Sequence, residues 1–413
     1  MKSNNNLIVV LIMILIYEIA LSFLKLDGLT ITKIIFTIIL WISAGIGVVS
    51  FFKNYTSIRK NIPKFALNIL ISIIIWNLIT ITIGFNDTGS TATLLGNRFN
   101  VLALLIPFSI AFAFIPSNLY KINTFIFKFL KILLALIFLY YVLNLGNLDT
   151  TILRTLKHLM PLFTFSITTY LFHFKKKYIV VISFITTAIL AYYVSDRTMI
   201  IRITLLLLSS ISLSYYIKYN SKWIINILFF IFFIPGILLQ QSITNNKSII
   251  KDLVTDINNE EYSTDTRTFL YQEVYLDLKK SSSLMTGKGA NGTYFSDYFY
   301  QTQEDNSNRL SVEVGVLSIM LKSGFIGLIL YLLILFSAIY LSFYKSNNYY
   351  VTGIGVMLLV YTVILFIENS VGYTLNNFII WFFIGIALSK EMRAKSNKEV
   401  FNLLNFNKKL TYG

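Results

Sequence analysis

Residues 287–296 read Gly-Lys-Gly-Ala-Asn-Gly-Thr-Tyr-Phe-Ser, near the end of a long polar stretch (residues 241–309) in an otherwise apolar sequence. The stretch holds about half of the 19 carboxylates and runs directly into Arg309-Leu-Ser-Val-Glu313-Val-Gly315. Apolar runs joined by short loops make up nearly all of the chain before it and most of the chain after it. We therefore expect any chemistry of this chain in this stretch, at one face of a membrane.

The composition predicts an all-α polytopic membrane protein. Of 413 residues 56% are hydrophobic and only 13% are charged, with a mean hydropathy of +0.69, whereas soluble domains carry roughly 25% charged residues. Apolar runs long enough to cross a hydrocarbon core of about 30 Å recur along the whole chain. Cysteine is absent, which excludes disulfides, zinc–thiolate sites and a catalytic thiol.

Hydropathy predicts about twelve transmembrane helices. They are expected at residues 7–24, 31–52, 62–83, 99–115, 124–144, 158–174, 178–194, 199–217, 223–240, 325–343, 350–367 and 371–388. The first run lacks a small-residue cleavage site and is interpreted as a retained helix rather than a signal peptide. The predicted organisation is helices one to nine in residues 1–240, a large loop in 241–323, helices ten to twelve in 324–389 and a basic tail in 390–413.

Lysines and arginines concentrate in alternate loops and in the tail, which by the positive-inside rule face the cytoplasm. Both termini are then cytoplasmic, and the large loop is extracytoplasmic at the cell membrane. The formal net charge of +16 is explained by topology and anionic headgroups, and nucleic acid is not expected as a partner. A single long loop in a membrane protein is more often functional than a tether.

The large loop has structure of its own. Residues 267–280 are rich in helix formers, with Leu270, Val274 and Leu278 at helical spacing and Asp265 as a candidate N-cap. A helix over residues 247–257 is less well marked. Residues 311–322 are expected to form a short amphipathic helix at the membrane interface, with the next span starting after Gly324.

Six of the eight arginines fall on or near the predicted outer face. They are Arg98, Arg154, Arg197, Arg202, Arg267 and Arg309. The positive-inside rule does not distinguish arginine from lysine, so topology alone does not explain this distribution. The guanidinium fork suits phosphate or carboxylate, so one interpretation is a site for pyrophosphate or an acidic sugar. The alternative is structural pairing, for instance of Asp196 with Arg197 or of Arg309 with Glu313 one turn on. Arg202, one turn inside its span, either faces a cavity or a partner or else snorkels to the interface.

The segment Gly287-Lys288-Gly289 within GKGANG matches the dinucleotide fingerprint, but no strand precedes it and no clear helix follows, so that interpretation is rejected. It is either a turn whose amides and Lys288 approach an anion or an ordinary tight turn. Glu313 and Glu273 are the candidate general bases. The intramembrane Glu18 and the interfacial Glu368 are interpreted as structural polar groups, and no residues show metal-ligand spacing, so neither a metal nor another cofactor is expected.

These features resemble the O-antigen and capsular polysaccharide polymerase/ligase superfamily of bacterial envelope proteins. The similarity covers the whole topology and a Ser-Asp-Arg-Thr segment at residues 195–198. Within and after the loop it rests on Arg267-Thr-Phe-Leu-Tyr-Gln-Glu273, on Gly287-Lys-Gly289, on Glu313-Val-Gly315 and on Leu321-Lys-Ser-Gly324-Phe-Ile-Gly327. Ligases of this superfamily usually carry a histidine in the large loop, and this loop has none, which favours a polymerase.

The resemblance implies a membrane glycosyltransferase with a fold like that of polyprenol-dependent enzymes. It would polymerise oligosaccharide repeat units linked to undecaprenyl diphosphate, alongside a flippase and a chain-length regulator of the same pathway. Arg197, Arg267 and Arg309 would bind the diphosphate, with Glu313 as the base. The substrate-binding residues would be Arg202, Glu273, Gly287, Lys288, Gly289, Asn291 and Tyr294. A ligase that transfers finished glycan and a flippase or exporter are the alternatives.

Overall fold

Nearly all of the described chain is helical. The computed structural model describes residues 5–23, 31–86, 91–143, 177–193, 197–219, 222–231, 268–296, 308–310 and 312–404. The elements before the large loop are α1 (Asn6–Phe23), α2 (Ile31–Lys53), α3 (Tyr55–Asn61), α4 (Lys64–Asn86), α5 (Thr91–Gly96), α6 (Val101–Leu105), the 3-10 helix η1 (Ile106–Phe114), α7 (Pro116–Leu143), α10 (Lys177–Tyr193), α11 (Arg197–Tyr219) and α12 (Lys222–Phe230). They are followed by α15 (Thr268–Lys280), β1 (Tyr294–Phe295), β2 (Asn308–Arg309), α17 (Gly315–Tyr344), α18 (Tyr349–Leu365), α19 (Leu375–Leu388), α20 (Lys390–Ala394) and α21 (Asn397–Leu404).

Several described helices have the length and composition of membrane spans. Four of them qualify alone, and a fifth span results if one bent helix pair is counted as a unit. The four cover Ile31–Lys53, Lys64–Phe85, Ile200–Tyr219 and Gly315–Tyr344, and shorter apolar helices lie at Asn6–Ala20, Tyr349–Leu365 and Leu375–Leu388. The described part of the chain is thus mostly helical, with several apolar helices long enough to cross a membrane, as expected of an all-α membrane protein. The span predicted at residues 158–174 and the end of the one at 223–240 lie outside the described residues.

The span predicted at residues 99–115 is not one continuous helix. It consists of the short helix α6 and the 3-10 helix η1, after which the chain turns by 112° into α7. Pro116 is the first residue of α7, and the residue before it, Ile115, is extended (φ −105°, ψ 110°). A proline disfavours helical geometry in the preceding residue but suits the first turn of a helix, so the bend falls here.

Helix α17 breaks where the sequence predicts. Gly324 has φ 64° and ψ −169°, a conformation essentially restricted to glycine, and it separates two helical segments. The helical segment before the break, predicted to be amphipathic, has no exposed polar face. Residues 315–323 are buried on every side, Lys322 included, because other elements of the protein cover the face on which Lys322 lies. Its ammonium donates to the carbonyl of Phe99 and to Asn100 Oδ1.

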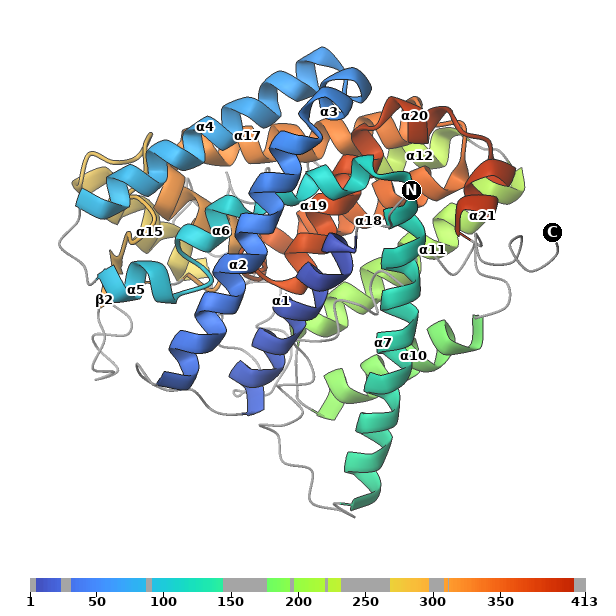
Figure 1. Cartoon of the computed structure of the whole chain (residues 1–413), viewed down its shortest axis with the longest axis horizontal. Coiled ribbons are helices and arrows are strands. Elements are labelled where there is room, and N and C mark those ends of the chain that lie inside the picture. The colour runs from blue at the N-terminus through green and yellow to red at the C-terminus, as the bar shows by residue number, and fades with distance from the viewer. Residues whose placement is uncertain are drawn as a thin grey trace, which may run out of the picture.

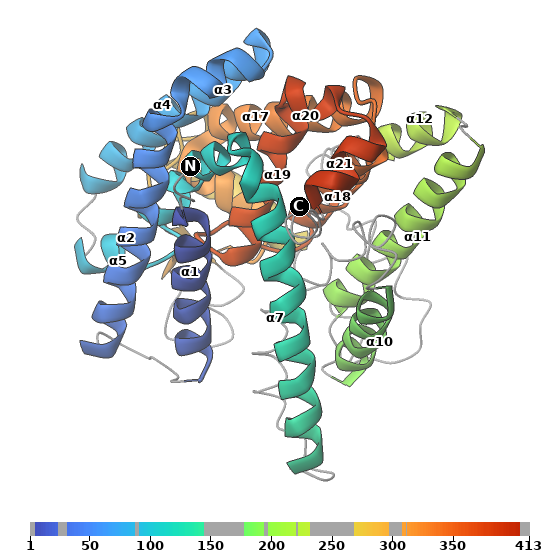
Figure 2. The same ribbon diagram turned by 45° about the vertical axis from the view of Figure 1, so that its right-hand side comes forward.

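The folded part of the large loop sits on the N-terminal segment of α17. Helix α17 packs along α4, α18 and α19, and α4 and α17 run side by side across the top of Figure 1. Helix α15 lies beside α17 and contacts β1, which pairs with β2 in an antiparallel two-residue ladder. Helix α7 projects beyond the other elements in both views (Figure 2). The loop therefore rests on the membrane helices rather than forming a separate unit.

Candidate functional site

Helix α15 forms as the apolar spacing predicts and ties the loop to the end of α18. Its Leu270, Val274 and Leu278 are buried, with exposed fractions of 1%, 0% and 0%. The Tyr271 hydroxyl donates to the carbonyl of Phe366 at 2.5 Å. The candidate N-cap Asp265, Arg267 and the helix predicted at 247–257 lie outside the described residues.

The glycine-rich turn is held by the break in α17. The amide of Lys288 donates to the carbonyl of Leu321 at 2.8 Å, and that of Gly289 to the carbonyl of Lys322 at 3.0 Å. These N–H groups are therefore used within the fold. This use of the amides is that of a tight turn, and the expectation that Gly287, Lys288 and Gly289 contact substrate stays a prediction.

Two glycines make this close approach sterically feasible. A Cβ on Gly287, which has a φ of +74°, would lie 2.4 Å from the carbonyl oxygen of Lys322. A Cβ on Gly324 would lie 2.1 Å from the carbonyl oxygen of Met285. Backbone atoms cannot yield to a side chain as the end of a flexible side chain can, so both positions require glycine.

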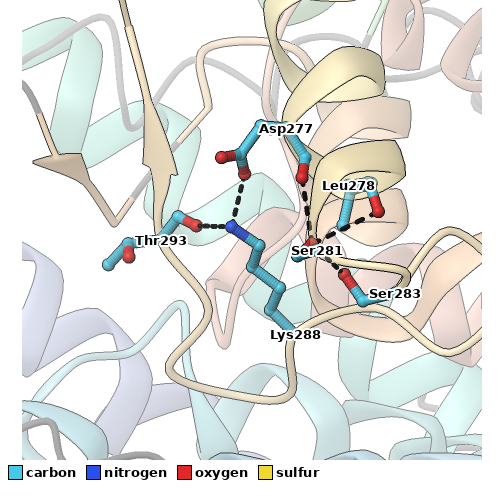
Figure 3. Close-up of polar contacts among 6 residues, drawn as sticks. All are labelled: Asp277, Leu278, Ser281, Ser283, Lys288 and Thr293. Carbon is cyan, nitrogen blue, oxygen red and sulfur yellow. Dashed lines mark hydrogen bonds and ion pairs between the residues drawn. The ribbon is translucent and has the colours of Figure 1, made fainter.

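The Lys288 ammonium is also committed to the fold. It lies 2.5 Å from Asp277 Oδ2 and donates to the carbonyl of Thr293 at 3.0 Å (Figure 3). The pair joins α15 to the segment that leads into β1. Asn291 is likewise buried, and its Oδ1 accepts from Asn100 Nδ2 at 3.5 Å. Both residues therefore hold the loop in place, and their expected role in binding substrate stays a prediction.

Polar side chains gather at the β1–β2 ladder. Tyr294 pairs with Arg309 across the ladder, and Ser296 Oγ donates to Glu273 Oε2 on α15 at 2.7 Å. With Glu313, whose charge also acts on Tyr294, these residues form what we call the ladder cluster: Glu273, Tyr294, Ser296, Arg309 and Glu313. Arg309 is in β2 and Glu313 precedes α17, so the two residues do not lie one turn apart on a helix, and their pairing stays a prediction.

Tyr294 is the most strongly perturbed member of the ladder cluster. Its side chain is 1% exposed, and its hydroxyl has no hydrogen-bond partner within the described part of the chain. Burial raises its pKa to about 12; the Arg309 charge opposes this shift, while the carboxylates of Glu273 and Glu313 add to it. Tyr294 is therefore a neutral phenol at physiological pH.

Arg202 has a partner, which decides between the two interpretations of this arginine. Its Nη2 lies 2.8 Å from Glu368 Oε2, and the two side chains are 11% and 23% exposed. Arg202 is in the second turn of α11, and Glu368 follows the end of α18. A charge inside a span is costly unless it is paired, and Glu368 supplies the opposite charge.

A single residue links this ion pair to the ladder cluster. The Asn369 amide donates to the carbonyl of Glu313 at 2.7 Å, and Asn369 Nδ2 donates to the carbonyl of Val312 at the same distance. Gly315 permits this contact, because a Cβ there would lie 3.1 Å from the carbonyl oxygen of Glu368. Arg202, Glu368 and Glu313 are thus held in one corner of the protein, where α11, α18 and the loop meet.

Arg98 forms a second ion pair, with Glu18 of α1. Arg98 Nη1 lies 4.0 Å from Glu18 Oε1 on α1, and the same oxygen accepts from the Leu375 amide at the start of α19 at 3.0 Å. The Arg98 carbonyl accepts from the Tyr373 amide at 2.9 Å. Glu18 therefore joins three segments in the way expected of a structural polar group.

Sequence reasoning identified part of this corner and missed the rest. The Arg197 side chain and Arg267 lie outside what the structure describes, so the expected approach of Arg267 and Arg309 to Arg197 stays a prediction. Glu368 was not expected to face a cation of the site. The signal that could have found it is an acid at the end of an apolar segment, where an unpaired charge is costly. No feature of the sequence identified Ser296 as a member of the ladder cluster.

The corner brings together a guanidinium, that of Arg202, and the carboxyl-bearing residues Glu368 and Glu313. Guanidinium groups bind phosphate oxygens bidentately, and a neighbouring carboxylate can accept the proton of a hydroxyl. Among the described residues no group of three or more His, Asp or Glu side chains is arranged to hold a metal ion. In comparisons with known proteins, no protein-family model, no curated protein and no solved structure matches this chain.

Proposed function

We propose that this protein is a membrane glycosyltransferase that polymerises oligosaccharide repeat units linked to undecaprenyl diphosphate, at the outer face of the bacterial cytoplasmic membrane. The observation that carries the proposal is the link through Asn369: its amide donates to the Glu313 carbonyl, and it directly follows Glu368, whose carboxylate pairs with Arg202 of a candidate membrane helix. A substrate with its lipid in the bilayer and its sugars outside requires binding groups on both sides of such a boundary.

In the proposed reaction, a sugar hydroxyl of the incoming lipid-linked unit attacks the anomeric carbon of the growing chain. The new glycosidic bond forms as the bond between that carbon and the diphosphate oxygen breaks, and the electron pair leaves with the lipid diphosphate. Arg202 and Arg309 stabilise the charge that develops on this leaving group. The Glu313 carboxylate accepts the proton of the attacking hydroxyl.

The ladder cluster would complete the site on the sugar side. The buried phenol of Tyr294 donates to a sugar oxygen, and Ser296 holds the Glu273 carboxylate in place through the 2.7 Å hydrogen bond. Glu368 has a positioning role, because it holds Arg202 in the absence of substrate and yields to the more highly charged diphosphate. The lack of a loop histidine favours this polymerase over a ligase.

The test is polymer formation by purified protein in proteoliposomes supplied with lipid-linked repeat units. We expect wild type to give a ladder of products, and Arg202→Ala and Arg309→Ala to lower the rate about 100-fold or more, as removal of transition-state charge donors does. Arg59→Ala is the matched control, since Arg59 is exposed on α3 far from this corner in sequence and should leave the ladder unchanged.

Three outcomes would refute the proposal. Full-length polymer from both arginine variants at normal protein levels would refute the proposed diphosphate site. In cells, deletion that leaves polymer length intact but abolishes attachment of glycan would indicate a ligase. Accumulation of lipid-linked units on the cytoplasmic side would instead indicate a flippase.

A further inference from the structure

An apolar groove of about 440 Å³ lies among α11, α12 and α18. Its walls include Leu208 and Ile211 of α11, Trp223 and Ile227 of α12, and Leu359 and Val363 of α18. Large apolar side chains are well exposed in it, Leu208 by 58% and Ile211 by 64%. Its volume is within the range of about 300–1,000 Å³ typical of small-molecule sites. The groove is thus large enough to hold part of a hydrocarbon chain.

The groove runs along α11 and ends near the ion pair. On α11 its wall extends from Leu205 to Tyr215, which is about 15 Å at the helical rise. Leu205 follows Arg202 by one helical turn, and Val363 of α18 precedes Glu368, which lies just beyond the end of that helix, by five residues. Both walls therefore lead to the two charged groups that approach within 2.8 Å of each other. The arrangement places a cation at one end of an apolar channel inside a candidate membrane span.

We propose that this groove binds the isoprenoid chain of the lipid-linked substrate, with its phosphate groups at Arg202; the inference rests on the proposed function. The charge pattern fits a lipid with a phosphorylated head and a single long tail. A multiply charged head can displace the Glu368 carboxylate from Arg202, because a guanidinium binds phosphate bidentately. The occupant is therefore an isoprenoid phosphate rather than a phospholipid acyl chain or a second copy of the protein.

Transfer of a tail from bilayer to groove gains little from the hydrophobic effect, because lipid is as apolar as the groove. Affinity then comes from the phosphate contacts and from close packing in the channel. A bulky side chain that fills the channel should weaken binding of the long-chain lipid without disturbing the charged pair. Binding of a soluble diphosphate that lacks a tail should not change.

The chain offers a matched pair of substitutions for this test. Leu208 lines the groove, whereas its neighbour Leu207 is 40% exposed and is not part of the wall. Leu208→Trp and Leu207→Trp add the same volume on the same helix turn. Ile227→Trp fills the groove from α12 and provides a second variant if Leu208→Trp does not fold, as judged by its elution from gel filtration and its melting temperature.

The experiment measures binding of undecaprenyl phosphate to full-length protein in phosphatidylcholine nanodiscs, with phosphatidylglycerol as competitor. We expect Leu208→Trp or Ile227→Trp to raise the Kd about tenfold or more and Leu207→Trp to leave it within twofold. A photoreactive undecaprenyl phosphate should label peptides of α11, α12 or α18. Equal binding by all variants, equal competition by phosphatidylglycerol, or labelling confined to other helices would overturn the inference.

This readout separates the two proposals. Groove-dependent binding by a protein that makes no polymer would leave the lipid site standing and refute the polymerase. Polymer formation that is unchanged in Leu208→Trp and Ile227→Trp would refute the groove and leave the polymerase standing.

Discussion

Replacing Gly324 by alanine should undock the glycine-rich turn from the break in α17. Gly324 has φ 64° and ψ −169°, a region in which a non-glycine residue costs about 1–3 kcal/mol. The added Cβ would also lie 2.1 Å from the carbonyl oxygen of Met285, so the turn must move away.

The movement breaks two further contacts. The amides of Phe325 and Ile326 donate to the carbonyls of Leu284 and Met285 at 3.0 and 3.2 Å. Each is worth about 1 kcal/mol net and more if the amide stays buried. Together with the backbone strain, Gly324→Ala should lower the free energy of unfolding by about 3–5 kcal/mol.

The assay is unfolding by sodium dodecyl sulfate in mixed micelles, followed by far-ultraviolet circular dichroism. Limited trypsin digestion gives a local readout, because cleavage after the half-buried Lys288 requires the turn to open and should accelerate in Gly324→Ala. The matched control is Gly47→Ala in α2, where a Cβ would meet no atom within 4 Å. That substitution should be neutral or stabilise by up to about 1 kcal/mol. If Gly324→Ala unfolds like wild type and its turn stays protected from trypsin, the docking argument is wrong.

The other predictions concern the polar contacts. Lys288→Met should lower the free energy of unfolding by about 1–2 kcal/mol, because it removes the ion pair with Asp277, whose side chains are about one-fifth exposed. Polymer synthesis should persist in this variant. Its loss in stably folded protein would show that Lys288 binds substrate. Tyr294→Phe should change the free energy of unfolding by less than about 0.5 kcal/mol, because its hydroxyl is unpaired among the described residues, while lowering activity; a large loss of stability would show a partner. Since the folded pKa of Tyr294 is about 12 against 10 unfolded, the folded state retains the proton longer, so wild-type stability should fall between pH 10 and 12 and this slope should be smaller in Tyr294→Phe. Glu368→Gln should lower the free energy of unfolding by about 1–3 kcal/mol, which is less than for a fully buried ion pair because this pair is partly exposed. A double-mutant cycle with Arg202→Met should give a coupling energy of the same size. A coupling energy of zero would mean that the ion pair contributes nothing to stability.

Much of the local structure can be predicted from sequence periodicity. The apolar composition predicts membrane helices, the spacing of Leu270, Val274 and Leu278 predicts α15, and Gly324 predicts the break in α17. These are properties of neighbouring residues along the chain, so helical geometry and the special freedom of glycine are sufficient to predict them. The separate spans predicted at residues 99–115 and 124–144 place a change of direction near Pro116, but the 3-10 geometry of η1 and the start of α7 at Pro116 were not predicted.

Tertiary structure decided which polar groups meet. Lys322 and the glycine-rich turn are buried against each other, because segments distant in sequence cover what looks like a polar face and a free loop. Glu368 and Arg202 are 166 residues apart, and no local pattern pairs them. Sequence alone therefore predicted a mostly helical protein whose apolar helices are long enough to cross a membrane. Packing decided that Arg202 pairs with Glu368 and Lys288 with Asp277, since pairing of charges depends on distances that only the folded chain sets.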